Sequence, residues 1–142
     1  MRFEDVYTSD RAPDFLWRLA AERSLEPEYN ISFKLPSWEE HLEFIQSRPY
    51  AHWFLVVGDR YHGDIRLTWN NEVGINLLKL SRGMGIGRRA LTKFFKEYKP
   101  LEAIPSKRPG VFVANINPKN ERSIKLFTSL GFVLRQHTYE RP

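Results

Sequence analysis

A run of closely spaced glycines is the stretch of the sequence whose residue types most directly suggest chemistry. It extends from Leu77 to Leu91 and reads Leu-Leu-Lys-Leu-Ser-Arg-Gly-Met-Gly-Ile-Gly-Arg-Arg-Ala-Leu. Glycines at alternate positions, Gly83, Gly85 and Gly87, remove side chains where backbone N–H groups converge. Apolar residues then recur at helical spacing, so the glycines lead into a helix whose N-terminus carries unpaired N–H groups and a partial positive charge. The stretch is therefore predicted to bind an anion, most simply a phosphate or pyrophosphate.

Two common phosphate-binding motifs do not fit this loop. The dinucleotide fingerprint requires a glycine where Arg88 stands. The P-loop requires Gly-Lys-Ser/Thr, whereas Gly87 is followed by two arginines. The pattern that is filled is Arg/Gln-x-x-Gly-x-Gly/Ala, with Arg82, Gly85 and Gly87 at its fixed positions. Taken alone, the loop leaves open a glycine-rich turn that binds no ligand.

The remaining sequence predicts the elements that position this loop. A first strand is expected over Arg2–Tyr7, and a helix over Asp14–Glu22 after a cap at Ser9-Asp10. A loop over Leu25–Phe33 precedes a second helix, which opens with a Ser37–Glu40 capping box and ends before Pro49. Three strands should then form an antiparallel meander: Trp53–Val57, Tyr61–Trp69 and Glu72–Leu78. After the loop and its helix come three further elements: a strand over Val111–Ile116, a helix over Glu121–Leu130, and a last strand from Phe132 to Arg135.

A second motif follows in the segment from Asn117 to Phe132. It resembles the Asn-x-x-Ala/Ser-x-x-Leu-Tyr-x-x-x-Gly-Phe helix of the GNAT superfamily of acetyl-CoA-dependent N-acetyltransferases, and the glycine loop resembles that family's coenzyme A pyrophosphate loop. Both motifs occur in the family's order over residues 72–132. The resemblance implies one acyl-CoA N-acyltransferase domain over residues 1–142. The expected fold is α+β, a mixed, mostly antiparallel sheet flanked by helices in the order βααβββαβαβ. Its last strand should be short or absent, because only ten residues follow Phe132.

The resemblance also implies which residues bind acetyl-CoA as cosubstrate. N–H groups from Gly83 to Arg88 would take the pyrophosphate, and backbone groups of the preceding strand would bond the pantetheine like an added strand. The Leu77 N–H would act as an oxyanion donor to the thioester carbonyl. The implied cofactor-binding residues are Leu77, Leu78, Lys79, Arg82, Gly83, Met84, Gly85, Ile86, Gly87, Arg88, Asn117, Asn120, Ser123 and Phe127.

Acetyl transfer to an amine needs a base, because an alkyl ammonium has a pKa near 10.4. Glu72 lies where the family often has a carboxylate and is the first candidate base. Alternatively, it is an exposed turn residue without a catalytic role. Asp64 is the second candidate, with a sheet-edge or turn-capping role as its alternative. His62 is the third, although a histidine on a surface strand needs no such role.

The family's usual tyrosine, thought to reprotonate the departing thiolate, is replaced by Phe127. Water, Tyr98 or Tyr139 would have to supply that proton, or the thiolate would leave unaided, which a thiol pKa near 8.5 permits.

Composition excludes several classes of function. The 142 residues are 42% hydrophobic and include no cysteine, which rules out a thiol nucleophile, a disulfide and thiolate metal ligands. Four scattered histidines do not suggest a metal site. The formal charge of +5 comes from dispersed basic residues, which favours a phosphate-rich coenzyme over nucleic acid. No signal peptide or membrane-length apolar run is evident, so a cytoplasmic protein without a membrane partner is expected.

The sequence therefore predicts an enzyme that transfers acetyl directly from acetyl-CoA to a primary amine of a small molecule. Leu16-Trp17-Arg18, His41 and Trp53-Phe54 are faintly similar to sugar-nucleotide N-acetyltransferases, so an amino sugar or sugar nucleotide is one acceptor class. A protein N-terminus or lysine is another. A coenzyme A-binding module without turnover is the non-enzymatic alternative. A homodimer is also expected, because a missing last strand would leave a sheet edge for a second protomer to cover.

Overall fold

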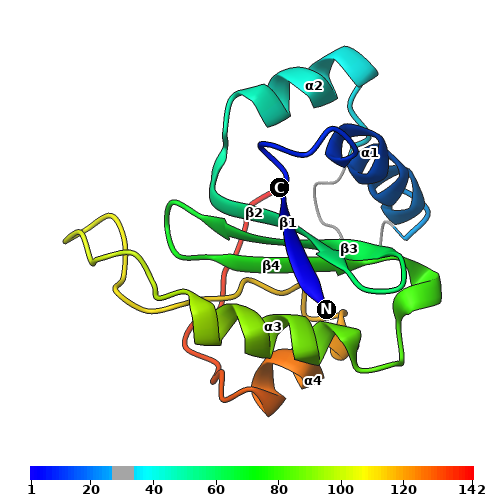
Figure 1. Cartoon of the computed structure of the whole chain (residues 1–142). Helices are drawn as coiled ribbons and strands as arrows, with labels where there is room; N and C mark the ends of the chain where they lie inside the picture. Colours follow the sequence, from blue (N-terminus) through cyan, green and yellow to red (C-terminus); the bar gives the residue numbers. More distant parts are fainter. Residues whose placement is uncertain (27–33) are drawn as a thin grey trace.

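The computed structural model describes residues 1–26 and 34–142, and it consists of a sheet with two helices on each face (Figure 1). The antiparallel sheet has the order β1-β2-β3-β4. Its strands are β1 (Arg2–Asp5), β2 (Tyr50–Val57), β3 (Tyr61–Thr68) and β4 (Val73–Leu77). Helices α1 (Ala12–Arg23) and α2 (Trp38–Gln46) cover one face, and α3 (Ile86–Glu97) and α4 (Glu121–Ser129) cover the other. Residues 27–33 of the loop expected over Leu25–Phe33 lie outside the described residues.

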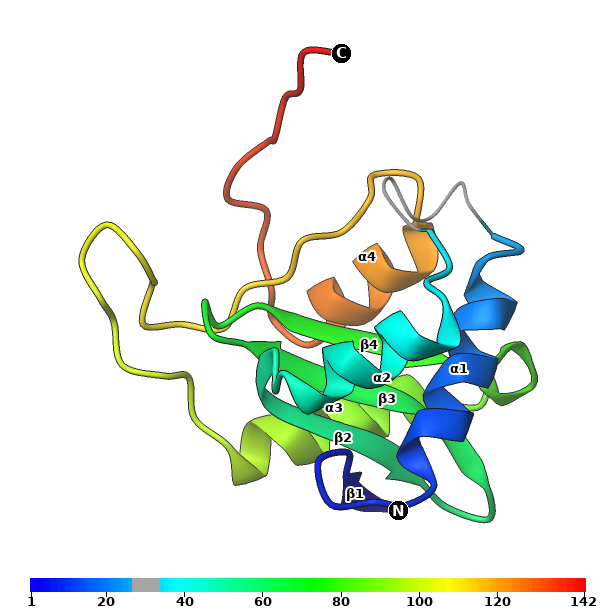
Figure 2. The same ribbon diagram turned by 90° about the horizontal axis from the view of Figure 1, so that it is seen from above.

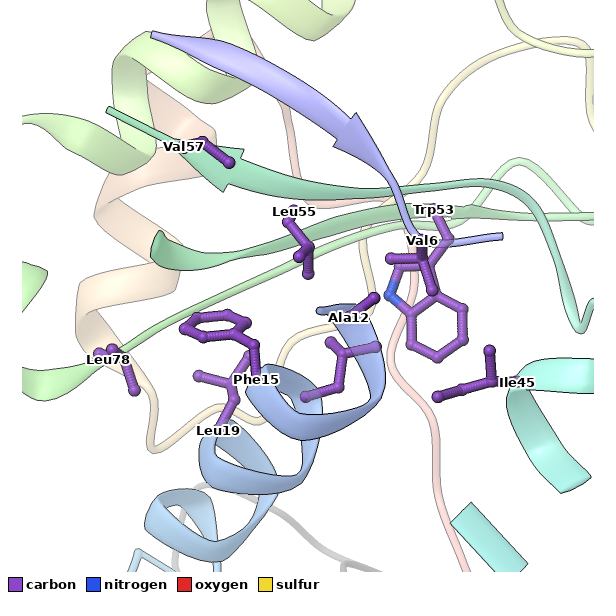
Figure 3. Packing of buried hydrophobic residues seen from close by; sticks show 10 residues of the cluster. Val6, Ala12, Phe15, Leu19, Ile45, Trp53, Leu55, Val57 and Leu78 are labelled. Atoms are coloured by element: carbon purple, nitrogen blue, oxygen red, sulfur yellow. The ribbon is translucent and has the colours of Figure 1, made fainter. Parts of the chain in front are cut away.

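Alternation along β2 divides the apolar side chains between two cores. Trp53, Leu55 and Val57 pack against α1 and α2, as Figure 3 shows. Phe54 and Val56 instead join the core beneath α3 and α4. The sheet is therefore covered on both faces, and β4 is left as its one edge on the side of the glycine loop.

The two N-terminal helices begin in different ways. The capping box predicted for α2 is confirmed: Glu40 N donates to Ser37 Oγ at 3.2 Å, and Ser37 N donates to Glu40 Oε1 at 3.0 Å. The predicted Ser9-Asp10 cap of α1 is wrong, because Arg11 is the N-cap and a proline occupies the first turn. The Ser9 hydroxyl donates to Glu4 Oε2 at 2.6 Å instead.

The predicted meander of β2, β3 and β4 is confirmed, and its second turn anchors a long connection. Asn71 in that turn is fully buried and has a φ of 65°. Its amide donates to the carbonyls of Leu101 and Pro109 at 2.8 and 2.7 Å, and it accepts from Leu101 N at 2.7 Å. One side chain thus fixes the proline-rich segment that returns the chain to the edge of β4.

The prediction of a strand over Val111–Ile116 is wrong. This segment forms only an isolated parallel bridge, between Glu72 and Val113. Val73 N donates to Val113 O at 2.8 Å and Val113 N donates to Asn71 O at 2.9 Å. Beyond this bridge no ladder continues between β4 and the described residues 114–116. The two segments therefore meet at one point and do not pair further.

The last strand, expected to be short or absent, is absent over residues 132–142, which the structure describes in full. Figure 2 shows this segment leaving the body of the molecule as an extended chain. The α+β class and the sequential order of the first six elements are nevertheless as predicted. Among the described residues, no helix has the length and apolar character needed to cross a membrane.

Candidate active site

The glycine loop is open on the side of its glycines. Gly83 and Gly85 have φ angles of 78° and 73°, and a Cβ atom built on either would meet no atom within 4 Å. Their need for glycine is therefore conformational, and unfilled space lies next to the backbone. Gly87 differs, since its Cβ would lie 3.2 Å from Leu126 Cδ2 and 3.5 Å from Leu77 Cδ1. This glycine allows α3 to pack closely against α4 and β4.

The N-terminus of α3 has the geometry of an anion site. Gly85 is the N-cap, and the first helical hydrogen bond runs from Arg89 N to Gly85 O at 3.1 Å. The N–H groups from Gly85 to Arg88 consequently have no partner within the helix. Ile86 is buried and anchors the turn, whereas Met84 is 54% exposed beside it. These N–H groups and the helix dipole favour a phosphate group in front of the loop.

Two of the three backbone N–H groups just before the loop already donate hydrogen bonds within the protein. Leu78 N donates to His62 O at 2.9 Å, and Lys79 N donates to Glu22 Oε1. The N–H groups of Leu78 and Lys79 are therefore already used within the protein, and only their carbonyl groups remain for the expected contact with a coenzyme. Of the three N–H groups, that of Leu77 is the one directed to the outer edge of β4, because Val73, four residues earlier in the strand, donates away from β3.

Alternation along β4 places a second group on this edge. Val73 N already points there, since it donates to Val113 O. Backbone groups of every second residue share a direction in a strand, so Ile75 and Leu77 present their N–H groups to the same edge. The sequence analysis names Leu77 as a site residue and does not name Ile75. The period of two along Val73–Leu77 was the signal that could have identified it.

A buried histidine supports the turn that leads into the loop. His62 is 5% exposed, with Nδ1 2.7 Å from Ser81 Oγ and Nε2 2.9 Å from Asp59 Oδ1. Ser81 is itself fully buried within the 3₁₀ turn Lys79–Ser81. Because both ring nitrogens already have partners, His62 is placed to hold the turn and not to deprotonate an amine.

Carboxylates from the end of α1 contact the cations around the loop. Arg82 Nη1 lies 2.9 Å from Glu26 Oε1, and Lys79 Nζ lies 3.6 Å from the same atom. Arg122 at the start of α4 lies 3.9 Å from Glu26 Oε2. The hydrogen bond from Arg82 holds the pKa of the Glu26 carboxyl below its usual value, against the effect of its partial burial. Glu26 thus joins the loop to the beginning of α4.

The face of the sheet beneath α1 and α2 carries a polar cluster. Asp64 is 3% exposed, and its Oδ2 accepts from Trp53 Nε1 at 2.8 Å and lies 3.5 Å from Arg66 Nη1. Asn76 donates to Oδ1 at 3.1 Å. With three donors on its two oxygens, Asp64 is suited to fixing its neighbours, and less suited to the predicted role of general base.

Glu72 lies on the same face, at the start of β4. Burial raises the pKa of Tyr50, and the negative charge of Glu72 raises it further. At about 3.4 Å per residue, its backbone lies roughly 17 Å from Leu77 but only about 10 Å from Ile75. Glu72 can therefore act near Ile75 through its side chain and a water molecule, and it is too distant to act near Leu77.

The α4 residues have mainly structural contacts. Asn120 caps the helix by accepting from Ser123 N at 3.2 Å, and Asn117 Oδ1 accepts from Lys119 N at 3.0 Å. Phe127 is 4% exposed, and its ring packs edge-on against Phe132 with a centroid distance of 5.1 Å. The expectation that Phe127 lines a coenzyme groove is therefore wrong, because its ring belongs to the core.

The two tyrosines considered as proton donors do not lie near the loop. Tyr98 stacks on Phe94 at the far end of α3, about 18 Å along the helix from its N-terminus. Tyr139 is 89% exposed in the C-terminal segment. Neither tyrosine can protonate a thiolate held next to β4.

Comparison with known proteins shows the fold but no close relative. No family model matches the chain, and no curated protein matches it in sequence. Among solved structures, spermidine N-acetyltransferase from Vibrio cholerae, in complex with CoA and spermine, aligns with a TM-score of 0.75 at 15% identity, over 99% of this chain and 85% of that one. An acetyltransferase from Thermus thermophilus aligns with a TM-score of 0.66 at 19% identity, over 94% and 88% of the two chains.

A third match is a Salmonella typhimurium protein solved with its cofactor acetyl-CoA. It aligns with a TM-score of 0.61 at 19% identity, over 92% of this chain and 77% of that one. The chain therefore has the fold of the GNAT acetyltransferases, as its two motifs predict. Among the residues described, no group of His, Cys, Asp and Glu is arranged to hold a metal ion.

Proposed function

We propose that this protein is an acetyl-CoA-dependent N-acetyltransferase that transfers the acetyl group directly to a primary amine of a small molecule. One observation carries the proposal. The open glycine loop leads into N–H groups that have no partner within α3, and it follows β4, whose outer edge has no ladder partner beyond Val113 among the described residues. A ligand with a diphosphate at one end and amides at the other fits both features. The shared fold with acetyltransferases supports this assignment.

The coenzyme would be held in two parts. Its pyrophosphate would accept hydrogen bonds from N–H groups between Gly83 and Arg88, with Arg82 beside them. Its pantetheine amides would pair with the edge groups of Ile75 and Leu77. The outer side of α3 adds a positive field, because a surface hollow of about 390 Å³ is lined there by Arg88, Arg89, Thr92, Lys93, Lys96 and Glu97.

The chain's groups would then act on the reacting atoms in turn. Fixing both substrates side by side supplies much of the rate enhancement, since effective molarities of about 10⁵ M or more are known for oriented pairs. A neutral amine attacks the thioester carbon, and negative charge develops on the carbonyl oxygen. The N–H group of Ile75, within reach of Glu72, is placed to stabilise the negatively charged carbonyl oxygen, and the N–H group of Leu77 would do so where water is the base. The C–S bond then breaks, and the surplus proton of the nitrogen passes through water to Glu72 or to bulk water. With Phe127 in the core, the thiolate leaves unprotonated or takes a proton from water.

The proposal is tested by measuring thiol release from acetyl-CoA with a panel of amines. The panel should contain alkylamines, amino sugars, amino-sugar nucleotides, and peptides with a free N-terminus or lysine. We expect amine-dependent thiol release with a small-molecule acceptor. Preference for a peptide would shift the assignment to protein acetylation. Tight coenzyme binding without thiol release would indicate a binding module.

Glu72→Gln is expected to lower kcat by about 10²-fold or more, the usual contribution of a general base. The loss should be greatest at low pH, because an amine with a pKa near 10.4 then depends most on assisted deprotonation. The measurement is a pH profile of acetyl transfer. Glu97→Gln, at the far end of α3 where Glu97 pairs with Lys93, is the matched control. A pH profile of Glu72→Gln that coincides with that of the unmodified protein would exclude Glu72 as the base.

We also propose that the protein forms a homodimer through its C-terminal segment. Val133, Leu134 and Tyr139 are 77%, 78% and 89% exposed, so large apolar groups stand unpacked in extended chain. Together with the open edge of β4, this segment offers a surface for a second protomer. Light scattering at micromolar concentration is expected to give twice the mass of the chain, and a strict monomer would contradict the dimer.

A further inference from the structure

The guanidinium group of Arg66 of β3 lies next to Gly74 of the neighbouring strand β4. A Cβ atom on Gly74 of β4 would lie 2.9 Å from Arg66 Cζ, so this glycine leaves the space that the guanidinium fills. The guanidinium lies 5.5 Å from the centroid of the Tyr50 ring, and its Nη1 lies 3.5 Å from Asp64 Oδ2. Its side chain is nevertheless 22% exposed. Arg66 is therefore a positioned cation that a ligand can still reach.

The location of this cation relates it to the proposed reaction. Gly74 immediately precedes Ile75, whose N–H faces the edge where the acetyl group would lie. Arg23, at the end of α1, brings a second guanidinium to the same face. Burial lowers the pKa of Arg23, and the positive charge of Arg66 lowers it further. An amine that approaches the thioester from beneath α1 and α2 therefore meets positive charge next to the reacting atoms.

Asp64 and Glu72 are carboxylates that lie on this face. Asp64 is buried and already bound by three donors, so it offers little to an incoming cation. Glu72 remains as the base of the proposed mechanism. A polyamine such as the spermine bound to the Vibrio cholerae enzyme would bring several positive charges to this face. The face beneath α1 and α2 instead suits an acceptor that carries negative charge.

We propose that Arg66 binds an anionic group of the acceptor, a carboxylate or a phosphate located a few bonds from the amine. This inference rests on the proposed function. The planar guanidinium fork matches two oxygens of such a group and forms charge-assisted hydrogen bonds with them. The same positive charge favours the neutral form of the nearby amine, which is the form that attacks. Arg66 thus selects the acceptor and assists its activation.

The test uses paired acceptors, one with and one without the anion. Glucosamine 6-phosphate is paired with glucosamine, methionine is paired with methioninamide, and spermidine is the polycationic reference. For each, kcat/KM is measured by acetyl transfer, and affinity for the CoA-loaded protein is measured by calorimetry, which needs no turnover. We expect the anionic member of one pair to be favoured by about tenfold or more, as for a hydrogen bond between charged groups. Which pair responds distinguishes phosphate from carboxylate.

Three variants test whether Arg66 is responsible for the preference. Arg66→Gln should reduce the preference within the responding pair to near unity, and Arg66→Lys should restore part of it. Gly74→Ala should also reduce the preference, because the added methyl group displaces the guanidinium while the charge remains. Arg60→Gln, in the exposed turn between β2 and β3, is the control and should leave the ratio unchanged.

Equal use and equal binding of both members of each pair, or a preference for spermidine, would overturn the inference and leave the proposed function standing. A preference that persists in Arg66→Gln would equally exclude Arg66. Absence of acetyl transfer to every amine would contradict the proposed function, and the calorimetric comparison would still decide whether the face selects anions.

Discussion

Gly85→Val is expected to abolish measurable binding of acetyl-CoA, with a loss of affinity of about 100-fold or more. Gly85 is the N-cap of α3 at a φ of 73°, a backbone conformation that a β-branched residue resists. The valine would move the N–H groups that face the pyrophosphate and place a side chain in the open space beside them. Each lost hydrogen bond to a charged group costs about 1.5–3 kcal/mol, so two account for the expected loss. Calorimetry with acetyl-CoA measures the effect.

The control for backbone strain is Gly131→Val. Gly131 follows α4 with a φ of 93°, and a Cβ atom there also meets no atom within 4 Å. Both variants should lose about 1–2 kcal/mol of unfolding free energy from the left-handed conformation. Only Gly85→Val should lose the coenzyme. Undiminished affinity in Gly85→Val, or an equal loss in both variants, would refute the assignment of the pyrophosphate to this loop.

Gly63→Ala is expected to have the largest effect on stability of any single methyl group added to the sheet. A Cβ atom on Gly63 would lie 1.9 Å from the Asn76 carbonyl oxygen and 2.9 Å from Leu77 Cα. Both obstacles are backbone atoms, so β3 and β4 would have to separate where the strand leads into the glycine loop. We expect a loss of about 3 kcal/mol or more, or failure to fold, measured by urea unfolding.

Gly74→Ala is the matched control in the facing strand. Its Cβ atom also meets an atom at 2.9 Å, but that atom is at the flexible end of the Arg66 side chain and can move. Its unfolding free energy should therefore change by less than about 1 kcal/mol. A Gly63→Ala protein as stable as Gly74→Ala would show that β3 and β4 do not approach as closely as described here.

The local sequence was enough to predict much of this fold. The period of two in β2 and β3 and the capping box of α2 each depend on residues close together in the chain, and each was confirmed. The start of α1 was misplaced because Ser9 bonds to Glu4 of a neighbouring element, a choice that depends on tertiary contact.

The strand over Val111–Ile116 shows why other features were missed. Its β-branched and aromatic residues fit an extended segment, and Phe112, Ala114 and Ile116 do pack into the core beneath α3 and α4. Whether such a segment pairs depends on the position of its neighbour, which Asn71 fixes through the Leu101–Pro109 connection. Propensity reports the extended shape and not the partner.

The candidate site divides in the same way. Glycine spacing predicted the open loop, because a left-handed backbone is a local property. The roles of His62, Asp64 and Arg66 depend on which atoms face them across the sheet. Asp64 is a candidate base from its residue type and its position beside Gly63, whereas its three donors come from three different strands.

The last turn of α1 and the residues after it meet both halves of the proposed site. Glu22 accepts from the backbone before the glycine loop and Glu26 pairs with Arg82, while Arg23 between them lies on the face assigned to the amine. We therefore expect that coenzyme bound at the loop, or acceptor bound on the opposite side, changes the electrostatic potential at residues 22–26. By thermodynamic linkage, if one ligand changes the affinity of the second by some factor, the second changes the affinity of the first by the same factor. If the proposed reaction is correct, we expect coenzyme and acceptor to alter each other's affinity through this segment.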